Sequence, residues 1–257
     1  MSAMTLKIIA CISMLLDHIG LVFDISILRI IGRLAFPLYL FLLYNGYKHT
    51  SNKLLYAVRL AVFAVISQVP FSLFTTGNVF SLNGNVFVTL FISLILIWIT
   101  DSMIKHRVAK WASFIPTAVL YSAYHFGFIV SDYGAKAVLM SFVFVAIYGD
   151  GKGMLRKLLT ALGILCAVFN SYIVKWLLLP AYWLIGQNPG WPTISYWQTV
   201  QIFSLLALPI IFLYNGKKGK FPIGNLKAKT VQYGFYLFYP VHMIALWAIM
   251  VVMNYLM

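Results

Sequence analysis

Long apolar runs return along the whole chain, and most exceed the length that a core helix of a soluble domain requires. A helix needs about 20 apolar residues to cross the ~30 Å hydrocarbon core of a bilayer. Runs of this kind fall near residues 6–24, 30–47, 54–74, 85–101, 110–130, 134–148, 154–186, 196–214 and 230–256. Because lipid offers no partner to open backbone, each run must be helical. The pattern predicts an all-α, polytopic transmembrane bundle of nine or ten helices.

The charged residues predict how this bundle is oriented. The chain has 19 Lys and Arg against five acidic residues, all Asp, and a net charge of +14. The basic residues concentrate in four connections near residues 48–59, 105–110, 152–157 and 217–229. By the positive-inside rule these connections and the N-terminus lie in the cytoplasm. We expect a multi-pass protein of the bacterial cytoplasmic membrane that meets anionic lipid and does not bind nucleic acid.

One predicted span is too long for a single straight helix. Residues 154–186 could hold two short helices, yet the charge pattern requires them to cross the membrane once in net. A broken or re-entrant helix satisfies both conditions, and Asn170, Ser171 and Lys175 mark the expected break. GQNPGWP (186–192) is expected to form an outer loop or hinge. No linker or repeat divides the chain, so residues 1–257 are expected to form one transmembrane domain.

Asp17 and His18 stand side by side inside the first predicted span, in SMLLDHIGLVF (13–23). An ionisable side chain at the centre of such a helix costs about 2.5–3.5 kcal/mol, so each needs a partner or a polar cavity. Asp17 lies about 100° round the helix from His18, so its partner must come from elsewhere, and Arg33 in the next span is the expected mate. Lys7 precedes His18 by eleven residues, which puts both on one face with His18 about 16 Å deeper.

Other polar side chains within the spans are candidates for the same interior. They are Asn45, Arg59, Gln68, Asn85, His125, Asp132, Tyr233, Tyr236 and His242. A single histidine among aromatic residues, such as His125, more often has a structural role, and loop lysines usually report topology alone. His18 differs because an aspartate adjoins it at depth. Asp101 and Asp150 flank loops and are expected to be solvated.

Several catalytic motifs are missing from the chain. There is no HExxH zinc helix, no GxSxG nucleophile elbow and no GxxxxGK[ST] phosphate loop. This disfavours metalloprotease, hydrolase and ATPase functions. Cys11 and Cys166 both lie in apolar runs, which offers neither a disulfide framework nor a CxxC metal motif. A cluster of His18, His125 and His242 has no ligand spacing behind it, so no metal site is predicted.

Six segments together resemble the TraX family, and the likeness runs nearly end to end. They are MLLDHIG (14–20), GRLAFPLYLFLLYNGY (32–47), ISQVPFSL (66–73), NVFVTL (85–90), DYGAKAVL (132–139) and YGFYLFYPVHM (233–243). That family is named for a conjugation protein that acetylates the N-terminus of pilin, and it is similar to the acyltransferase-3 group of membrane acyltransferases. In that wider group the first helix carries a basic residue, ten intervening residues and a histidine, which is the spacing of Lys7 and His18.

The resemblance implies a membrane acetyltransferase that takes cytoplasmic acetyl-CoA. Lys7 would guide this co-substrate and His18 would take a proton from the acceptor, either the N-terminal amine of a pilin-like peptide or a hydroxyl of a cell-envelope glycan. The resemblance also implies cofactor contacts from Lys53 and Arg59, by loose correspondence, and Arg33 is a further expected cofactor contact. Supporting roles would fall to Asn45, Asn85, His125, Asp132, Tyr233 and His242.

The residues themselves are consistent with that chemistry. A thioester is already activated, so an enzyme mainly orients it, excludes water and removes one proton from the nucleophile. His18 is suited to this task, and Asp17 would stabilise the imidazolium, so the two are expected to form an acid–base pair. Two other functions remain open. One is a proton-coupled transporter whose path is lined by Asp17, His18 and Arg33, and the other is a structural protein that binds lipid through its lysines.

Overall fold

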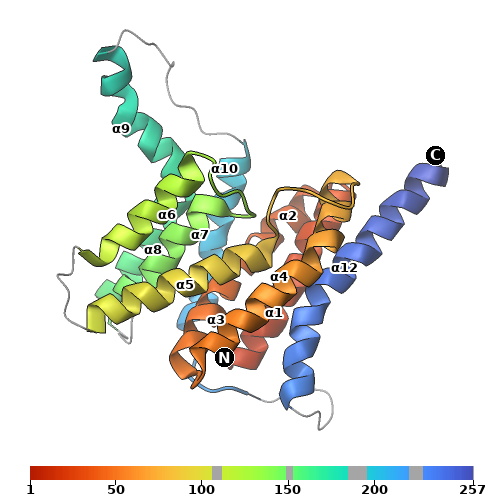
Figure 1. The fold of residues 1–257 in the computed structure, drawn as a ribbon, viewed down its shortest axis with the longest axis horizontal. Coiled ribbons are helices and arrows are strands. Elements are labelled where there is room, and N and C mark those ends of the chain that lie inside the picture. The colour runs from red at the N-terminus through yellow and green to blue at the C-terminus, as the bar shows by residue number, and fades with distance from the viewer. Residues whose placement is uncertain (106–111, 149–152, 185–195, 220–227, 257) are drawn as a thin grey trace.

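The computed structural model describes residues 1–105, 112–148, 153–184, 196–219 and 228–256. These residues form helices and contain no β-strand (Figure 1). The α-helices are α1 (Ala3–Val22), α2 (Ser26–Gly32), α3 (Ala35–His49), α4 (Lys53–Thr76), α5 (Val86–Lys105), α6 (Ile115–His125), α7 (Gly134–Val143), α8 (Met154–Val168), α9 (Asn170–Leu184), α10 (Tyr196–Gln201), α11 (Ala207–Phe212) and α12 (Ala228–Leu256). Two 3-10 turns (Ala112–Phe114 and Ile202–Leu206) and a π turn (Phe144–Tyr148) complete the described elements.

Five helical units are long and apolar enough to cross a membrane. They are Ala3–Val22, Ser26–His49, Lys53–Thr76, Val86–Lys105 and Thr230–Leu256. In the second unit α2 and α3 follow each other through a short turn at Arg33. Gly134–Tyr148 and Thr199–Phe212 are shorter apolar units. The prediction of an all-α membrane bundle is confirmed, and the chain has the helices of a multi-pass integral membrane protein.

The long run at 154–186 is broken where the sequence indicated. α8 ends at Val168 and α9 begins at Asn170. The side chain of Asn170 occupies the break, because its Nδ2 donates to the Ala167 carbonyl at 2.6 Å and its Oδ1 accepts from the Tyr121 hydroxyl at 3.2 Å. Beyond the break α9 extends away from the other helices (Figure 1). The predicted outer loop at 186–192 lies outside the described residues.

Polar side chains set the ends of the principal helices. Ser2 accepts from the Thr5 amide at the start of α1, and Asn52 accepts from the Leu55 amide at the start of α4. α4 stops at Gly77, whose φ of 71° is the left-handed conformation that glycine adopts without strain. Asn85 accepts from the Phe87 amide at 2.9 Å and so caps α5. These caps explain why the long apolar runs start and stop at defined residues.

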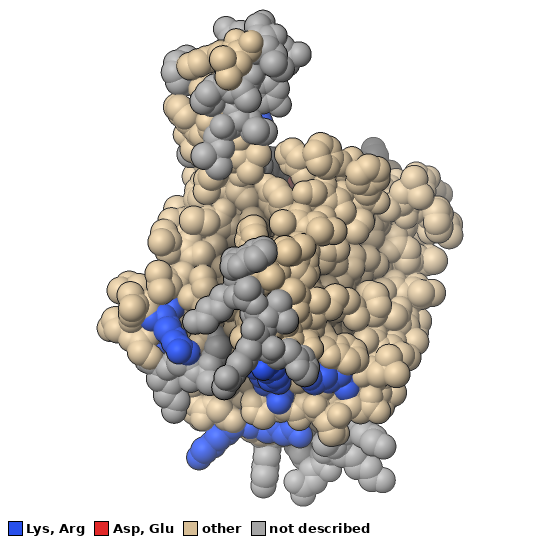
Figure 2. Space-filling model, turned by 60° about the vertical axis from the view of Figure 1, so that its left-hand side comes forward, with Lys and Arg blue, Asp and Glu red and all other residues tan. Residues whose placement is uncertain are grey.

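Lys and Arg side chains gather toward one end of the molecule (Figure 2). We call this the basic end; it comprises the start of α1, the α3–α4 turn, the end of α5 and residues 217–218. The backbone joins these parts, since the Ala3 amide donates to the Lys217 carbonyl at 2.9 Å. Asp101 at the basic end was expected to be solvated, and this is wrong: it is 5% exposed because it is enclosed by cationic partners. Asp150 lies outside the described residues.

α12 packs against both α4 and α1, and these three helices carry the histidine pair and the ring beside it. The buried residues of α12 include Tyr239, His242, Met243 and Leu246. Their spacing of three and four residues gives a single helical face. The N-terminal parts of α1 and α12 both lie at the basic end, so the two helices run in the same direction (Figure 1).

Candidate active site

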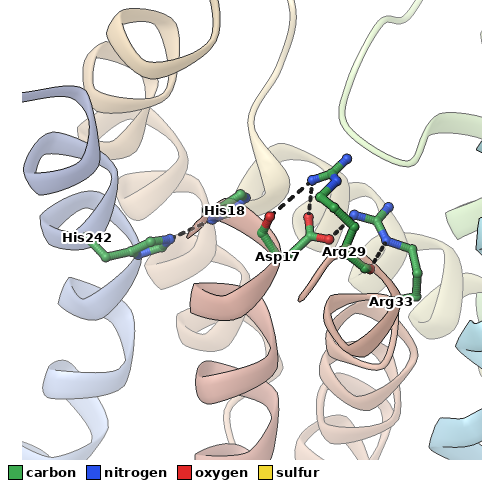
Figure 3. A network of polar contacts seen from close by, with 5 residues as sticks. All are labelled: Asp17, His18, Arg29, Arg33 and His242. Atoms are coloured by element: carbon green, nitrogen blue, oxygen red, sulfur yellow. Dashed lines mark hydrogen bonds and ion pairs between the residues drawn. The ribbon is translucent and has the colours of Figure 1, made fainter. Parts of the chain in front are cut away.

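The carboxylate of Asp17 is held by two guanidinium groups near the far end of α1 (Figure 3). Arg29 Nη1 donates to Oδ2 at 2.8 Å and Arg33 Nη2 donates to Oδ1. The side chains of Asp17, Arg29 and Arg33 are only 10, 16 and 8% exposed. The predicted pairing with Arg33 is therefore present. Arg29 was missed because it lies between the apolar runs at 6–24 and 30–47, in a segment that was treated as a connection.

Glycine allows α2 to approach α1 at this carboxylate. A Cβ atom built on Gly32 would lie 2.3 Å from the Cβ of Asp17, and one on Gly20 would lie 2.9 Å from the carbonyl oxygen of Ile25. No side chain fits at such distances, so both positions require glycine while the helices stay this close. The close approach is what lets the short α2 present two arginines to one aspartate.

His18 is bonded to a histidine 224 residues away in the sequence. Its Nδ1 lies 2.8 Å from Nε2 of His242 on α12, with the two rings stacked at a centroid distance of 5.1 Å. Phe74 of α4 packs its ring against His18 at 5.3 Å. His242 is fixed in turn, because its Nδ1 lies 2.7 Å from the carbonyl oxygen of Phe238. Three helices thus define the position of the His18 ring.

Asp17 and His18 leave α1 in different directions, Asp17 toward α2 and His18 toward α12 (Figure 3). The expected Asp17–His18 acid–base pair does not form, since the carboxylate is occupied by arginines and the imidazole by a second imidazole. The physical reason is the 100° turn between adjacent helical residues. His242, which was assigned a supporting role, is the direct partner.

The hydrogen bonds assign the tautomers of both histidines. A backbone carbonyl only accepts, so His242 Nδ1 carries the proton and donates to Phe238. In a neutral ring the Nε2 of His242 is then an acceptor, and His18 Nδ1 must donate to it. His18 Nε2 is left with its lone pair. This arrangement makes His18 Nε2 a base whose orientation is fixed by its neighbour.

A small cavity lies beside these groups. Its volume is about 20 Å³, enough for about one water molecule. It is lined by Met14, Asp17, His18, Gly32, Ala35, Phe36, Tyr39, Val86, Asp132, Tyr133 and Tyr239. Four separate helical units (α1, α2–α3, α5 and α12) and the connection before α7 therefore meet at this cavity.

Asp132 lines this cavity from the connection between α6 and α7. Burial raises the pKa of its carboxyl to about 6, and the positive charge of Arg33 opposes that rise. No Lys, Arg or His nitrogen of the described residues lies within 4 Å of the carboxylate. Its backbone is held firmly, since the Asp132 amide donates to the Gly84 carbonyl at 2.9 Å. Among the described residues Asp132 is thus a buried carboxyl outside any ion pair, with a pKa of about 6.

Lys7 and His18 meet the same helix at two levels. Lys7 Nζ lies 5.6 Å from the centre of the Phe235 ring, and Phe235 precedes His242 on α12 by seven residues, or two turns. The face of α1 that carries Lys7 and His18 therefore faces α12 from the basic end to the cavity.

The four residues assigned to cofactor binding do not form one cluster. Lys53 Nζ donates to the Tyr47 hydroxyl at 2.9 Å and lies over the Tyr47 and Trp98 rings. Arg59 lies over the Tyr56 ring at 5.7 Å and interacts with Tyr236 of α12. Arg33 is at the opposite end of the bundle, bound to Asp17. Lys7 and Arg59 remain as the basic pair beside α12.

Four of the six supporting residues lie away from the cavity. Asn45 Nδ2 donates to the Tyr214 hydroxyl at 3.0 Å, and Asn85 caps α5. His125 is exposed and stacks on Tyr121, while Tyr233 is 45% exposed. Asp132 and His242 are the two that reach the site. In the described part of the chain no group of three or more His, Cys or acidic side chains converges to hold a metal.

A row of aromatic rings links the basic end to the histidine pair. We define this aromatic row as Phe63, Tyr236, Phe87 and Tyr239. Successive centroids are 4.8, 5.9 and 5.4 Å apart, and Tyr239 lies 5.6 Å from His242. The row follows α12 between α4 and α5, with Arg59 at its start. It marks a continuous apolar seam with cations at one end and an imidazole base at the other.

Comparison with known proteins gives a consistent result along the whole chain. The family model described as TraX protein matches residues 2–250. A probable fimbrial assembly protein, FimC of serogroup H1 from Dichelobacter nodosus, is 30% identical over 94% of this chain and 92% of its own length. No solved structure matches the chain significantly. The chain belongs to the TraX family.

Proposed function

We propose that this protein is a membrane acetyltransferase that moves the acetyl group of acetyl-CoA to an amine, with His18 as the general base. The observation that carries the proposal is the chain of two hydrogen bonds from the Phe238 carbonyl through His242 to His18. It leaves His18 Nε2 unprotonated and aimed by its partner. General-base catalysis of this kind contributes about 10²–10⁴-fold to a rate.

The basic end supports acetyl-CoA as the donor. Phosphate groups are bound by Lys and Arg side chains, and Lys7 and Arg59 flank the Phe235–Tyr236 segment of α12 at that end. From Lys7 to His18 the helix rises about 16 Å, and the aromatic row lies beside α12 between the levels of Phe235 and His242. An extended pantetheine arm in this seam would carry its thioester to His18. A cytoplasmic basic end, as the positive-inside rule predicts, would meet the cellular pool of acetyl-CoA.

The cavity volume sets a condition on this reaction. About 20 Å³ holds a water molecule and not an acetyl thioester with its acceptor. Substrate therefore requires the seam between α1, α4 and α12 to widen, with Phe74 and Tyr239 as the side chains that must move. Opening of this kind is common where a catalyst has to exclude water until the substrate is bound.

His242 and Asp17 have different roles in this mechanism. His242 positions His18 and stabilises the tautomer that leaves Nε2 free. Asp17 holds α2 against α1 through Arg29 and Arg33, and so keeps the cavity wall in place. The nitrogen of the acceptor attacks the thioester carbonyl, His18 receives its proton, and the thiolate of CoA leaves as a thiol after protonation. No covalent enzyme intermediate is needed.

The relative's name favours a peptide acceptor over a glycan. The D. nodosus protein is described as a probable fimbrial assembly protein, and fimbriae are built from protein subunits. We therefore favour the N-terminal amine of a pilin-like peptide as the acceptor. A proton-coupled transporter receives less support, because Asp17 and Arg33 are paired with each other and are not open to a transported ion.

The test uses two histidines of the same chain. Purified protein in nanodiscs is given acetyl-CoA and a pilin-like peptide, and thiol release and peptide acetylation are measured. His18→Ala should lower turnover by about 10²–10⁴-fold, while His125→Ala, at an exposed histidine away from the cavity, should leave it unchanged. Thermal stabilisation by acetyl-CoA should persist in both variants. Near-normal turnover of His18→Ala would remove the basis of the proposal.

A further inference from the structure

The His18 base cannot by itself handle all the protons of an amine acceptor. An α-amino group has a pKa of about 7.7–8.0 and is largely protonated at neutral pH. The balanced reaction is R–NH₃⁺ plus acetyl–S–CoA giving R–NH–acetyl, HS–CoA and one free proton. The nitrogen loses two protons, of which one ends on the thiol of CoA. The other must be accepted before attack, because an ammonium ion has no lone pair.

Asp132 lines the same cavity as His18. Both residues line the space of about 20 Å³, across which a single water molecule can connect them. The other carboxylate on this wall, Asp17, is already neutralised by two arginines. Asp132 has no such partner within 4 Å among the described residues, and burial raises its pKa to about 6. It is therefore able to bind and release a proton near neutrality.

The electrostatic setting of Asp132 comes from several elements. The titratable and charged groups that face it are Asp17 and His18 of α1, Arg29 of α2, Arg33 after it, Tyr39 of α3, the adjoining Tyr133, Lys136 of α7 and Tyr239 of α12. Arg33 favours the carboxylate, whereas Asp17 and the burial of the group favour the acid. Because these effects oppose one another, the pKa of the Asp132 carboxyl lies at about 6.

We propose that Asp132 is a second catalytic base, which takes the ammonium proton of the acceptor and passes it to the side of the membrane opposite the basic end. This rests on the acetyl-transfer function proposed above and assigns the acceptor as a protonated amine. Asp132 lies in the connection between α6 and α7, whose residues Phe128 and Val130 are exposed. His18 then needs to move only the second proton, from the attacking nitrogen to the leaving thiolate.

The test compares two acceptors that differ in their need for the first deprotonation. One is a peptide with a free α-amine, and the other is the same peptide with an aminooxy group, which is already neutral at pH 7. Asp132→Asn should lower turnover of the amine by about 10-fold at pH 7, where only about a tenth of the α-amine is already neutral, and turnover of the aminooxy peptide by less than about threefold. The loss for the amine should shrink toward pH 9, where the acceptor loses its proton to water.

Both acceptors are measured on the same preparation, so partial unfolding of the variant lowers both rates equally and cannot imitate the expected difference. Asp24→Asn, at an exposed aspartate in the α1–α2 connection, is the matched control and should behave as the wild type. Equal losses for the two acceptors, or no loss for the amine, would overturn the role of Asp132 while leaving acetyl transfer intact. A wild-type protein that acetylates neither acceptor would instead overturn the proposed function, and this proposal with it.

Discussion

Two buried carboxylates in this protein each bind two cationic side chains, but those side chains differ in their exposure to water. Asp17, near the far end of α1, binds Arg29 and Arg33, and Asp101, at the basic end, binds Lys48 and Lys105 at 2.9 Å each. The arginines are 16 and 8% exposed, whereas the lysines are 25 and 60% exposed. Water can therefore reach the cations of Asp101 and is largely excluded from those of Asp17.

The difference shows that two clusters of one carboxylate and two cations can constrain the tertiary structure to different extents. Lys105 is four residues from Asp101 on the same helix, so that pair constrains little tertiary structure. Arg29 and Arg33 belong to the helix after α1, so their pairs fix the contact between α1 and α2. The Asp17 cluster borders the histidine pair and the cavity, while the Asp101 cluster lies among the basic residues that a positive-inside topology requires.

The largest expected effect is the loss of stability when each of the two carboxylates is replaced by an amide. Asp17→Asn leaves two buried arginines without their counter-charge and should destabilise the protein by about 3–5 kcal/mol. Asp101→Asn keeps an acceptor for the Tyr47 hydroxyl and leaves partly exposed lysines, so about 1 kcal/mol is expected. Unfolding midpoints in one detergent measure both. Equal losses for the two variants would contradict the argument from depth.

A smaller effect is expected on acetyl transfer when His242, the partner of His18, is replaced. His242→Ala should lower acetyl transfer by about 10–100-fold, because His18 loses the acceptor that fixes its tautomer. His242→Gln should recover part of this loss, since an amide oxygen can accept from His18 Nδ1. The change should appear in kcat and leave KM for acetyl-CoA unaltered. If the two variants are equally impaired, His242 acts through packing and not through its hydrogen bond.

A third carboxylate, Asp132, extends the comparison to a group with no cation within 4 Å in the described residues. Its folded-state pKa of about 6 lies above the ordinary value of 3.8, so the folded protein holds a proton that the unfolded chain has lost. Stability should therefore fall as pH rises from about 4 to 6. Asp132→Asn should flatten this slope, as thermal midpoints across that range would reveal. An unchanged slope would mean that Asp132 titrates normally.

The smallest effect is expected at the exposed rim of the basic end. Lys105→Ala should change stability by less than about 0.5 kcal/mol, because an exposed pair within one helix is weak. Any difference from wild type should disappear in about 1 M salt, where such charges are screened. A large, salt-resistant loss would place Lys105 in the same class as Arg33.

Much of the site was predictable because burial of charge in lipid is so costly. The cost argument identified Asp17 and His18, and it paired Asp17 with Arg33 across a helix boundary. Asn170 was predictable as a break because it is polar within an overlong apolar run. Asp101 was predicted wrongly, since closeness to a loop does not reveal that Tyr47, Lys48 and Lys105 enclose it.

The sequence by itself determined the membrane class, the helical content, the basic end and the stripe that joins Lys7 to His18, because these follow from apolar length, charge and the 3.6-residue period. Only the tertiary structure decided that His18 bonds to His242, that α2 adds Arg29, and that Asp132 shares their cavity. Periodicity gives the direction in which a side chain leaves its helix. Periodicity does not tell which distant helix packs against that side chain, because the neighbour depends on how all the spans pack together.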